Sequence, residues 1–398
     1  SQSGALGTSI LDWAVEQNVG FSYFVSVGSM IDISFSDLID YFGTDNNTTS
    51  ILIYMESLKD ARRFMSAARS FARSKPIIIL KAGKSKEGSK ATQSHTGSLA
   101  GDDEVYDAAF RRAGIIRVET IAQLFHSAQA LAMQPRPRGN HLAIVTNAGG
   151  PGVLATDYLI QNKGKLAEFS EATMQKLDES LPEHWSHNNP VDVLGDASAE
   201  TYRKALKACL NDSSVDGILT IFTTQAVSEP SEAAIEVVQV ARKRKKPILA
   251  VWMGERDVAE SRDILEHGQV PHYRYPESAV DVFVKMFQYS QNLDSLYETP
   301  PETPQEFELR TDEAHKIIQN ALKDKQTKLA ESTSKALMAC YDIPITKNKI
   351  TTTADQAVAF ANEIGYPVVM KIESPDIGHK SDVVGLKLNL QNDEEVRV

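Results

Sequence analysis

One histidine stands in a stretch whose residue types suit phosphoryl chemistry. Residues 84–101 (KSKEGSKATQSHTGSLAG) contain glycines, hydroxyl side chains and a single imidazole, His95, with no leucine, isoleucine or valine before Leu99. An apolar run at 77–80 precedes this stretch, and an amphipathic pattern at 102–112 follows it. The pattern predicts that a loop presents His95 at the carboxyl end of a buried strand, the edge at which open α/β sheets bind ligands. We interpret His95 as a covalent phosphate carrier; the alternative is an ordinary surface histidine.

A phosphate-carrying histidine needs a carboxylate that orients one ring nitrogen and makes the other more basic. Glu56 is the best candidate, because it follows the apolar run at 51–55, which predicts a neighbouring strand. The alternative is a charge that simply ends that strand. His184 and His187 have a spacing that suggests metal ligands, but no third ligand is near them in the sequence, and we prefer a role within a loop.

The phosphoryl oxygens need an anion site, and two stretches predict one. Residues 1–7 (SQSGALG) precede a predicted helix at 8–15, in which Ile10, Leu11, Ala14 and Val15 are the expected buried positions. Residues 147–152 (NAGGPG) stand between a predicted strand at 141–146 and a predicted helix at 153–160. Backbone N–H groups at helix starts lack partners and bind anions, and glycines let a phosphate approach closely. We expect the two starts to face one anion from opposite sides; a plain capped helix is the alternative for the first.

The order of strands and helices predicts an α/β protein with parallel sheets covered by helices on both faces. A strand at 21–27 belongs to this pattern, and the prolines and charges at 134–140 (QPRPRGN) predict a linker. The expected organisation is, in chain order, a domain at 1–135, a second α/β domain at 139–292, a hinge or linker at 293–325 and a third unit at 326–398.

Composition narrows the class of partner. The formal net charge of -11 argues against nucleic acid or an anionic membrane. Cys209 and Cys340 are the only cysteines and lie far apart, which favours the reducing cytoplasm and gives no disulfide framework or thiolate metal site. No apolar run approaches the length of a membrane span. We expect small-molecule partners, and we expect the chain to be a piece of a longer protein.

Three motifs together resemble the acyl-CoA synthetase (NDP-forming) superfamily, which includes ADP-forming acetate–CoA ligase and is related to succinyl-CoA synthetase. They are SHTGSLAG at 94–101, SQSGALG at 1–7 and GYPVVMKI at 365–372. The resemblance covers nearly the whole chain. It implies two flavodoxin-like parallel-sheet CoA-ligase domains, of which the first carries the phosphohistidine, followed by the beginning of an ATP-grasp domain at 326–398.

The resemblance also implies a reaction, in which acyl-CoA, ADP and phosphate are interconverted with a carboxylic acid, CoA and ATP through acyl phosphate and phosphohistidine. The cofactors are CoA and ATP or ADP, with Mg²⁺ whose ligands are expected outside this chain. By position, His95 is the phosphohistidine and Glu56 the carboxylate that holds it. The implied phosphate-cradling residues at the two helix starts are Ser3, Gly4, Gly149, Gly150 and Gly152. The family tends to assemble as dimers or larger, so a homo-oligomer is expected.

Two further residues match the nucleotide end of the family. His379 begins the sequence HKSD at 379–382, which matches a second phosphate-carrying histidine of fused acetate–CoA ligases. Lys371 matches the lysine of ATP-grasp folds that contacts the nucleotide. A competing interpretation remains open, because some bacterial protein lysine acetyltransferases carry a similar region that senses acyl-CoA. The piece is not expected to complete the reaction alone.

Overall fold

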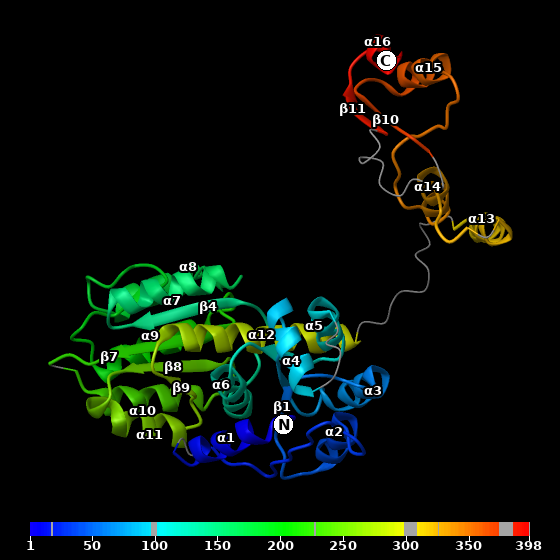
Figure 1. Ribbon diagram of the computed structural model, residues 1–398. Helices are drawn as coiled ribbons and strands as arrows, with labels where there is room; N and C mark the ends of the chain where they lie inside the picture. Colours follow the sequence, from blue (N-terminus) through cyan, green and yellow to red (C-terminus); the bar gives the residue numbers. More distant parts are fainter. Residues whose placement is uncertain are drawn as a thin grey trace. The chain divides into compact units, whose positions relative to one another are not determined.

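The computed structural model describes residues 1–16, 19–96, 102–226, 228–297, 309–324, 326–373 and 385–397, and only the backbone of residues 16 and 92–96. The chain divides into two compact units, Ser1–Glu298 and Thr299–Val398. Figure 1 shows the helices and strands of each unit. Each unit is described by itself.

A parallel sheet lies in the first part of the larger unit. Its strands are β1 (Ile51–Met55), β2 (Ile77–Lys81) and β3 (Ile116–Val118), paired in the order β1-β2-β3. Every residue of β2 is buried, as expected for the middle strand of a parallel sheet. The helices of this part are α1 (Gly4–Glu16), α2 (Phe35–Thr44), α3 (Ala61–Phe71), α4 (Lys86–Thr96), α5 (Asp103–Arg112) and α6 (Ile121–Met133). Side-chain caps set several starts; Asp60 accepts from the Arg63 N–H before α3, and Thr120 accepts from the Gln123 N–H before α6.

A second parallel sheet has the strand order β5-β4-β7-β8-β9, with β6 paired to β4. The strands are β4 (His141–Thr146), β5 (Lys165–Leu166), β6 (Val191–Asp192), β7 (Gly217–Thr223), β8 (Ile248–Met253) and β9 (His272–Tyr273). The helices around them are α7 (Gly149–Gln161), α8 (Glu171–Ser180), α9 (Ala199–Asn211), α10 (Pro230–Ala241) and α11 (Ala259–His267), with a short 3-10 turn at Arg256–Val258. Helix α9 contacts β4 and β7, and α7 contacts β4 and β5. The central strands are buried and mostly apolar, as expected for parallel strands that are covered on both faces, with Thr146 and Thr220 as buried polar exceptions.

Helix α12 (Pro276–Tyr297) joins the two sheets into one unit. Its first half packs with the second sheet through Phe283 and Met286, and its last turns pack with the first sheet through Leu293 and Leu296. The Tyr289 hydroxyl donates to the Ala72 carbonyl at 2.6 Å. The helix therefore continues beyond residue 293, where the sequence suggested that a hinge begins.

The smaller unit holds the helices α13 (Thr311–Lys323), α14 (Glu331–Ala339), α15 (Ala354–Ile364) and α16 (Asp393–Arg397). Strands β10 (Val368–Lys371) and β11 (Leu386–Leu390) pair antiparallel, with an irregularity between Val368 and Met370. Val358, Ala361, Val368, Leu390 and Val396 form its buried core. No helix among the described residues is long and apolar enough to cross a membrane.

Two predicted features differ from the structure near the amino end. Residues 21–27 form no strand and run as irregular backbone, in which Ser1 bonds to Val25 and Val27 and the Met30 N–H closes a turn on the Val27 carbonyl. In α1, Ile10 and Ala14 are buried as predicted, but Leu11 is partly exposed and Val15 is 82% exposed. The buried stripe of α1 is therefore narrower than the apolar pattern suggested.

His272 makes the stability of the larger unit depend on pH. Burial, assisted by the charge of Arg262, lowers the pKa of this histidine to about 4. Between pH 6.5 and 4 only the unfolded state takes up the proton, so stability falls as the pH drops through this range, by up to about 3 kcal/mol. The substitution His272→Gln should flatten the urea-unfolding free energy over this range. The exposed His267 supplies the control, and equal slopes in His272→Gln and His267→Gln would contradict the prediction.

Candidate functional site

Glu56 lies at the carboxyl end of β1, as the sequence predicted, and is only 5% exposed. Its backbone N–H donates to Oε1 of Gln2 at 2.5 Å, and the Ser57 N–H donates to the same oxygen at 3.1 Å. The side chain of Glu56 contributes to a raised pKa of Tyr54, after the larger effect of burial. The buried Gln2 thus fixes the start of α1 against the end of β1. Sequence reasoning missed Gln2, although a glutamine between two serines ahead of an apolar helix was a visible signal.

Some of the backbone N–H groups at the start of α1 already have hydrogen-bond acceptors within the protein. The Ser3 hydroxyl accepts from the Leu6 N–H at 3.3 Å, and the Ser3 N–H donates to the Ser1 hydroxyl at 3.1 Å. A Cβ atom added at Gly4 would stand 3.7 Å from the Ser26 hydroxyl, an ordinary contact. Ser3 is therefore a helix cap as well as a predicted phosphate contact.

The start of α7 is more open to an anion. Gly149, Gly150 and Gly152 form its first turn rather than a loop before it, so α7 begins four residues before the predicted start at 153. None of the described side chains caps this start, and a Cβ atom at Gly150 would meet nothing within 4 Å. Asn147 holds the turn in place, because its amide exchanges two hydrogen bonds with the backbone of Thr223 at 2.8 and 2.9 Å. The first-turn N–H groups of α7 can bind an anion.

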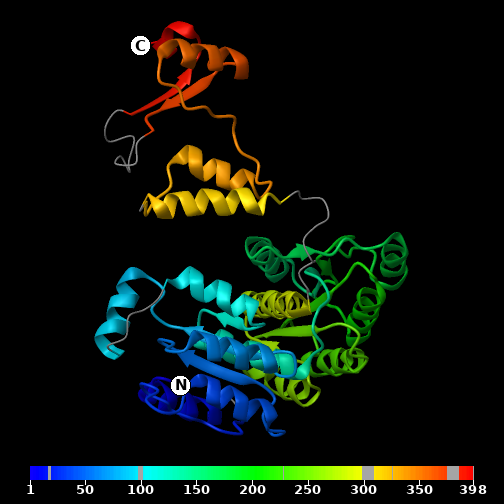
Figure 2. The same ribbon diagram turned by 90° about the vertical axis from the view of Figure 1, so that its right-hand side faces the viewer.

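The two helix starts do not face each other within one chain. Figures 1 and 2 show α1 and α7 in separate parts of the larger unit, with strands of the second sheet between them in Figure 1. Helix α7 packs instead against α12, β4 and β5. The prediction that both starts address one anion is not met by a single chain.

His95 lies in a helix, which corrects the predicted loop. Helix α4 (Lys86–Thr96) begins after Ser85, whose hydroxyl accepts from the Gly88 N–H at 2.9 Å. This cap and the helix-favouring Lys90, Ala91 and Gln93 outweigh the glycine and hydroxyl content that suggested a loop. The side chain of His95 lies outside the described residues, as do residues 97–101 of the same motif.

A buried lysine at the same edge of the first sheet was missed. Lys81 ends β2 and is 1% exposed, and its Nζ atom stands 4.7 Å from the centre of the Tyr106 ring. Burial lowers the pKa of Lys81, and the carboxylates of Asp103 and Glu56 partly oppose that shift. A buried lysine whose pKa is shifted by its surroundings is typical of a functional site. The signal was visible as a lysine directly after the all-apolar run at 77–80.

Further cations lie near Lys81. Arg117 in β3 donates to Oδ1 of Asp103 at 2.6 Å, and Lys84 pairs with Glu119. The carboxyl edge of the first sheet therefore combines a buried carboxylate, a buried ammonium and partly buried ion pairs. Such an edge can hold and neutralise an oxyanion.

The candidate residues of the smaller unit are only partly described. Lys371 ends β10, and its Nζ atom donates to Oε1 of Glu331 at 2.8 Å. Lys335 pairs with the same carboxylate oxygen at 3.1 Å. His379 lies outside the described residues, within 374–384.

His187 uses both ring nitrogens within the protein. Nδ1 stands 2.7 Å from Oδ1 of Asp178, and Nε2 stands 3.0 Å from the Glu183 carbonyl. The bond to Asp178 raises the pKa of His187. Among the described residues, no group of three or more histidine, cysteine or acidic side chains is arranged to hold a metal ion.

Comparison with protein families places three models along the chain. The Succinyl-CoA ligase like flavodoxin domain matches residues 1–131, the Ligase-CoA domain matches 142–296, and the ATP-grasp domain matches 320–398. These ranges follow the order of domains that the sequence predicted.

Curated relatives match almost the whole chain. The 4-hydroxybutyrate–CoA ligase (ADP-forming) of Nitrosopumilus maritimus is 36% identical over 399 residues, which cover 100% of this chain and 56% of the relative. The acetate–CoA ligase (ADP-forming) I of Archaeoglobus fulgidus is 41% identical over 396 residues, which cover 99% of this chain and 56% of the relative. The chain thus spans little more than half the length of these relatives.

A solved structure has a similar fold. The Ca. Korarchaeum cryptofilum dinucleotide forming acetyl-coenzyme A synthetase 1, in complex with phosphate and ADP, superposes with a TM-score of 0.69 at 33% identity, covering 74% of this chain and 64% of that chain. Together with the three family models, it confirms the predicted fold class of flavodoxin-like and CoA-ligase domains followed by the beginning of an ATP-grasp domain. The chain belongs to the acyl-CoA synthetase (NDP-forming) superfamily, as the motifs predicted.

Proposed function

We propose that this chain provides the phosphohistidine part of an ADP-forming acyl-CoA ligase, which interconverts acyl-CoA, ADP and phosphate with a carboxylic acid, CoA and ATP. The observation that carries the proposal is the match of at least 99% of the chain to relatives named as ADP-forming CoA ligases. The buried Glu56 and Lys81 at one edge of the first sheet support it, because phosphoryl transfer depends on positioning and on neutralising charge.

The chemistry proceeds in four transfers. Phosphate attacks the thioester carbonyl, the C–S bond breaks, and CoA leaves as the thiol, which yields an acyl phosphate. An imidazole nitrogen of His95 then attacks phosphorus, the bond from phosphorus to the acyl oxygen breaks, and the carboxylate leaves. An imidazole nitrogen of His379 next takes the phosphoryl group from His95. A terminal phosphate oxygen of ADP finally takes the group from His379, which leaves both imidazoles restored and yields ATP.

The Glu56 carboxylate and the two helix starts have roles in the first two transfers. The Glu56 carboxylate orients the imidazole and raises its basicity. The backbone N–H groups at the starts of α1 (Ser3 and Gly4) and α7 (Gly149, Gly150 and Gly152) bind the oxygens of phosphate. The proposal includes a homo-oligomer, because the two helix starts do not face each other within one chain.

The nucleotide end of the reaction belongs to the smaller unit. Lys371 would contact the nucleotide, and His379 would carry the phosphoryl group close to ADP. Mg²⁺ would neutralise the phosphates of the nucleotide when bound, with ligands expected outside this chain. We place the protein in the cytoplasm, because Cys209 and Cys340 are both unpaired and buried.

The test is a labelling experiment on the full-length protein. With acetyl-CoA and radiolabelled phosphate we expect a covalent phosphoryl label that is labile in acid and stable in base, and we expect ADP to release it as labelled ATP. Binding of acetyl-CoA without any label would overturn the proposal and favour an acyl-CoA-sensing role instead.

Lys81→Met should raise the stability of the protein and lower its rate of labelling. Because burial lowers the pKa of Lys81, removal of its charge should raise the free energy of unfolding at neutral pH by up to about 1 kcal/mol. Loss of this cation should lower the initial rate of labelling about tenfold. Urea unfolding and labelling would be compared with Lys59→Met, which alters an exposed lysine just beyond Glu56. A labelling rate equal to that of the control would show that Lys81 has no part in the reaction.

A further inference from the structure

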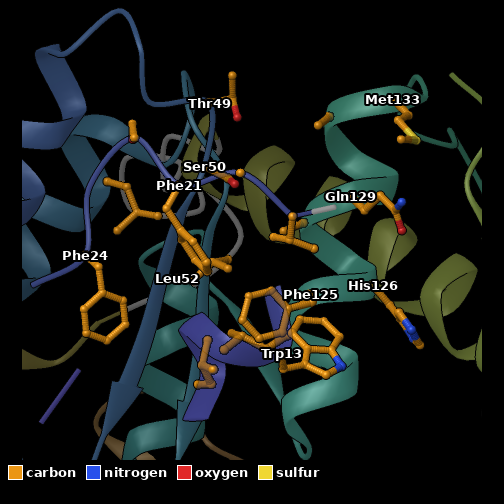
Figure 3. Close-up of a pocket in the computed structure, with 18 of the residues that line it drawn as sticks. Trp13, Phe21, Phe24, Thr49, Ser50, Leu52, Phe125, His126, Gln129 and Met133 are labelled. Carbon is orange, nitrogen blue, oxygen red and sulfur yellow. The ribbon is translucent and has the colours of Figure 1, made fainter. Parts of the chain in front are cut away.

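The two helix starts differ in what lies beside them. Helix α1 borders a cavity of about 850 Å³, around which Figure 3 shows the apolar side chains of Trp13, Phe21 and Leu52. The start of α7 instead lies beside a carboxylate, because a Cβ atom added at Gly149 would stand 3.3 Å from Oδ2 of Asp192. A carboxylate at an anion site repels the anion, unless the anion brings a proton that the carboxylate can accept in a hydrogen bond.

The fold holds Asp192 in this position. Asp192 ends β6 and pairs in parallel register with Thr146, the last residue of β4, so it stands where the chain turns from β4 into α7. The Asp192 N–H donates to the Ser186 hydroxyl at 2.9 Å, and Oδ1 of Asp192 accepts from the Leu194 N–H at 3.0 Å. The second bond fixes the rotation of the carboxylate and leaves Oδ2 on the side of Gly149.

Oδ2 of Asp192 is open to a ligand. Among the described residues it has neither a hydrogen-bond donor nor an ion-pair partner, since the bond of the carboxylate to the protein runs through Oδ1. Burial, assisted by the charge of Asp192, raises the pKa of Tyr202, but the Tyr202 hydroxyl donates to the Ile221 carbonyl at 2.9 Å. The partly buried Asp192 therefore offers one acceptor oxygen beside the first turn of α7.

We propose that Asp192 makes the anion site at the start of α7 select phosphate against sulfate. The inference rests on the proposed function, in which this start binds the substrate phosphate. Inorganic phosphate keeps at least one proton near neutral pH, so a hydroxyl of phosphate can donate to Oδ2 while its other oxygens accept from the N–H groups of Gly149 and Gly150. Sulfate has a similar shape but no proton near neutral pH, and it would set a charged oxygen against the carboxylate.

The glycines of the first turn fit this role. A side chain at 149 would stand closer to Oδ2 of Asp192 than an ordinary contact allows, and a side chain at 150 would enter the open space beside the turn. A carboxylate can also lie at a helix start simply to stabilise the helix dipole. Such a carboxylate would act on every dianion alike, so the ratio between the affinities for two anions separates the two roles.

The test measures the binding of radiolabelled phosphate to the full-length protein by equilibrium dialysis, with unlabelled sulfate or arsenate as competitor at constant ionic strength. Arsenate is protonated like phosphate, so in the wild-type protein the dissociation constant of sulfate should exceed that of arsenate at least about tenfold. In Asp192→Asn the side-chain oxygen still accepts from the Leu194 N–H, whereas the amide nitrogen can donate to either anion. The ratio of the sulfate to the arsenate dissociation constant should therefore fall about tenfold or more.

Asp157→Asn is the matched control, because it removes one charge from an exposed position of the same helix. This variant should keep the wild-type ratio and the wild-type Tm. Equal competition by sulfate and arsenate in the wild-type protein would overturn the proposal without any variant, as would an absence of phosphate binding. Equal ratios in Asp192→Asn and Asp157→Asn would overturn it as well.

The ligase proposal is tested separately by labelling from acetyl-CoA and phosphate. A protein that selects phosphate but takes no label would contradict the ligase reaction and keep the role of Asp192. A protein that takes the label but binds sulfate as well as arsenate would contradict only the role of Asp192.

Discussion

Replacement of His95 by alanine should abolish the phosphoryl label of the full-length protein. In the proposed reaction the imidazole of His95 is the only group of the larger unit that bonds to phosphorus, so its removal leaves acyl phosphate with no acceptor there. Labelling with acetyl-CoA and radiolabelled phosphate, followed by acid and base treatment, measures the effect. The loss should be complete, whereas loss of a supporting group lowers the rate.

His267 gives a matched control for this variant. Both histidines lie at the carboxyl end of a helix, His95 in the last turn of α4 and His267 as the last residue of α11. His267→Ala should keep the full label and the wild-type Tm. A label of normal size and acid lability in His95→Ala would disprove the role of His95. A residual label that disappears only with a further change at His379 would show that His379, in the smaller unit, is the first residue to accept the phosphoryl group.

The repeating strands could be predicted because burial on both faces leaves a strong local signal. The runs at 51–55, 77–80 and 142–145 are apolar without interruption, and β1, β2 and β4 lie there. Residues 21–27 show the same kind of signal but form no strand, because a strand needs a partner that its own sequence does not specify. Helix α12 could not be placed in advance for a similar reason, since its two halves belong to the cores of different sheets.

Helix α4 shows a different limit of predicting backbone conformation from the sequence. Glycine, serine and threonine lower helix propensity only modestly, and a single capping serine ahead of lysine, alanine and glutamine residues reverses the balance. The pattern around 147–152 was misjudged in the same way, because three glycines and a proline suit the first turn of a helix as well as a loop. In both places the backbone conformation differs from the predicted one, and the chemistry assigned to the segment stays a prediction.

Only the part of the candidate site that lies at the ends of strands could be predicted from the sequence. Glu56 follows an apolar run and could be placed at the carboxyl edge from the sequence alone. Its burial depends on Gln2, which lies 54 residues earlier and reaches the Glu56 backbone only after folding. The burial of Lys81 likewise depends on α5, which supplies the Tyr106 ring. Contacts between distant segments therefore set the electrostatics that the sequence left open.

Glu56→Gln should lower the initial rate of labelling about 10- to 100-fold without unfolding the protein. Glutamine has the same shape as glutamate, and the two bonds that Gln2 accepts in this region come from backbone N–H groups, which the substitution retains. The free energy of unfolding should therefore change by less than about 1 kcal/mol. Glu119→Gln is the matched control, because Glu119 also follows a strand of the first sheet but is exposed and pairs with Lys84.

The pH dependence of labelling distinguishes a positioning role for Glu56 from a purely structural one. A carboxylate beside an imidazole raises the imidazole pKa, so its replacement by an amide should lower that pKa. The rate of labelling rises as the imidazole loses its proton, and in Glu56→Gln this rise should move to lower pH while the plateau falls. A plateau that falls with no movement along the pH axis, or a curve identical to that of Glu119→Gln, would remove Glu56 from the site. A shift to lower pH is expected only if the carboxylate acts on the imidazole itself, because loss of packing alone would scale the whole curve.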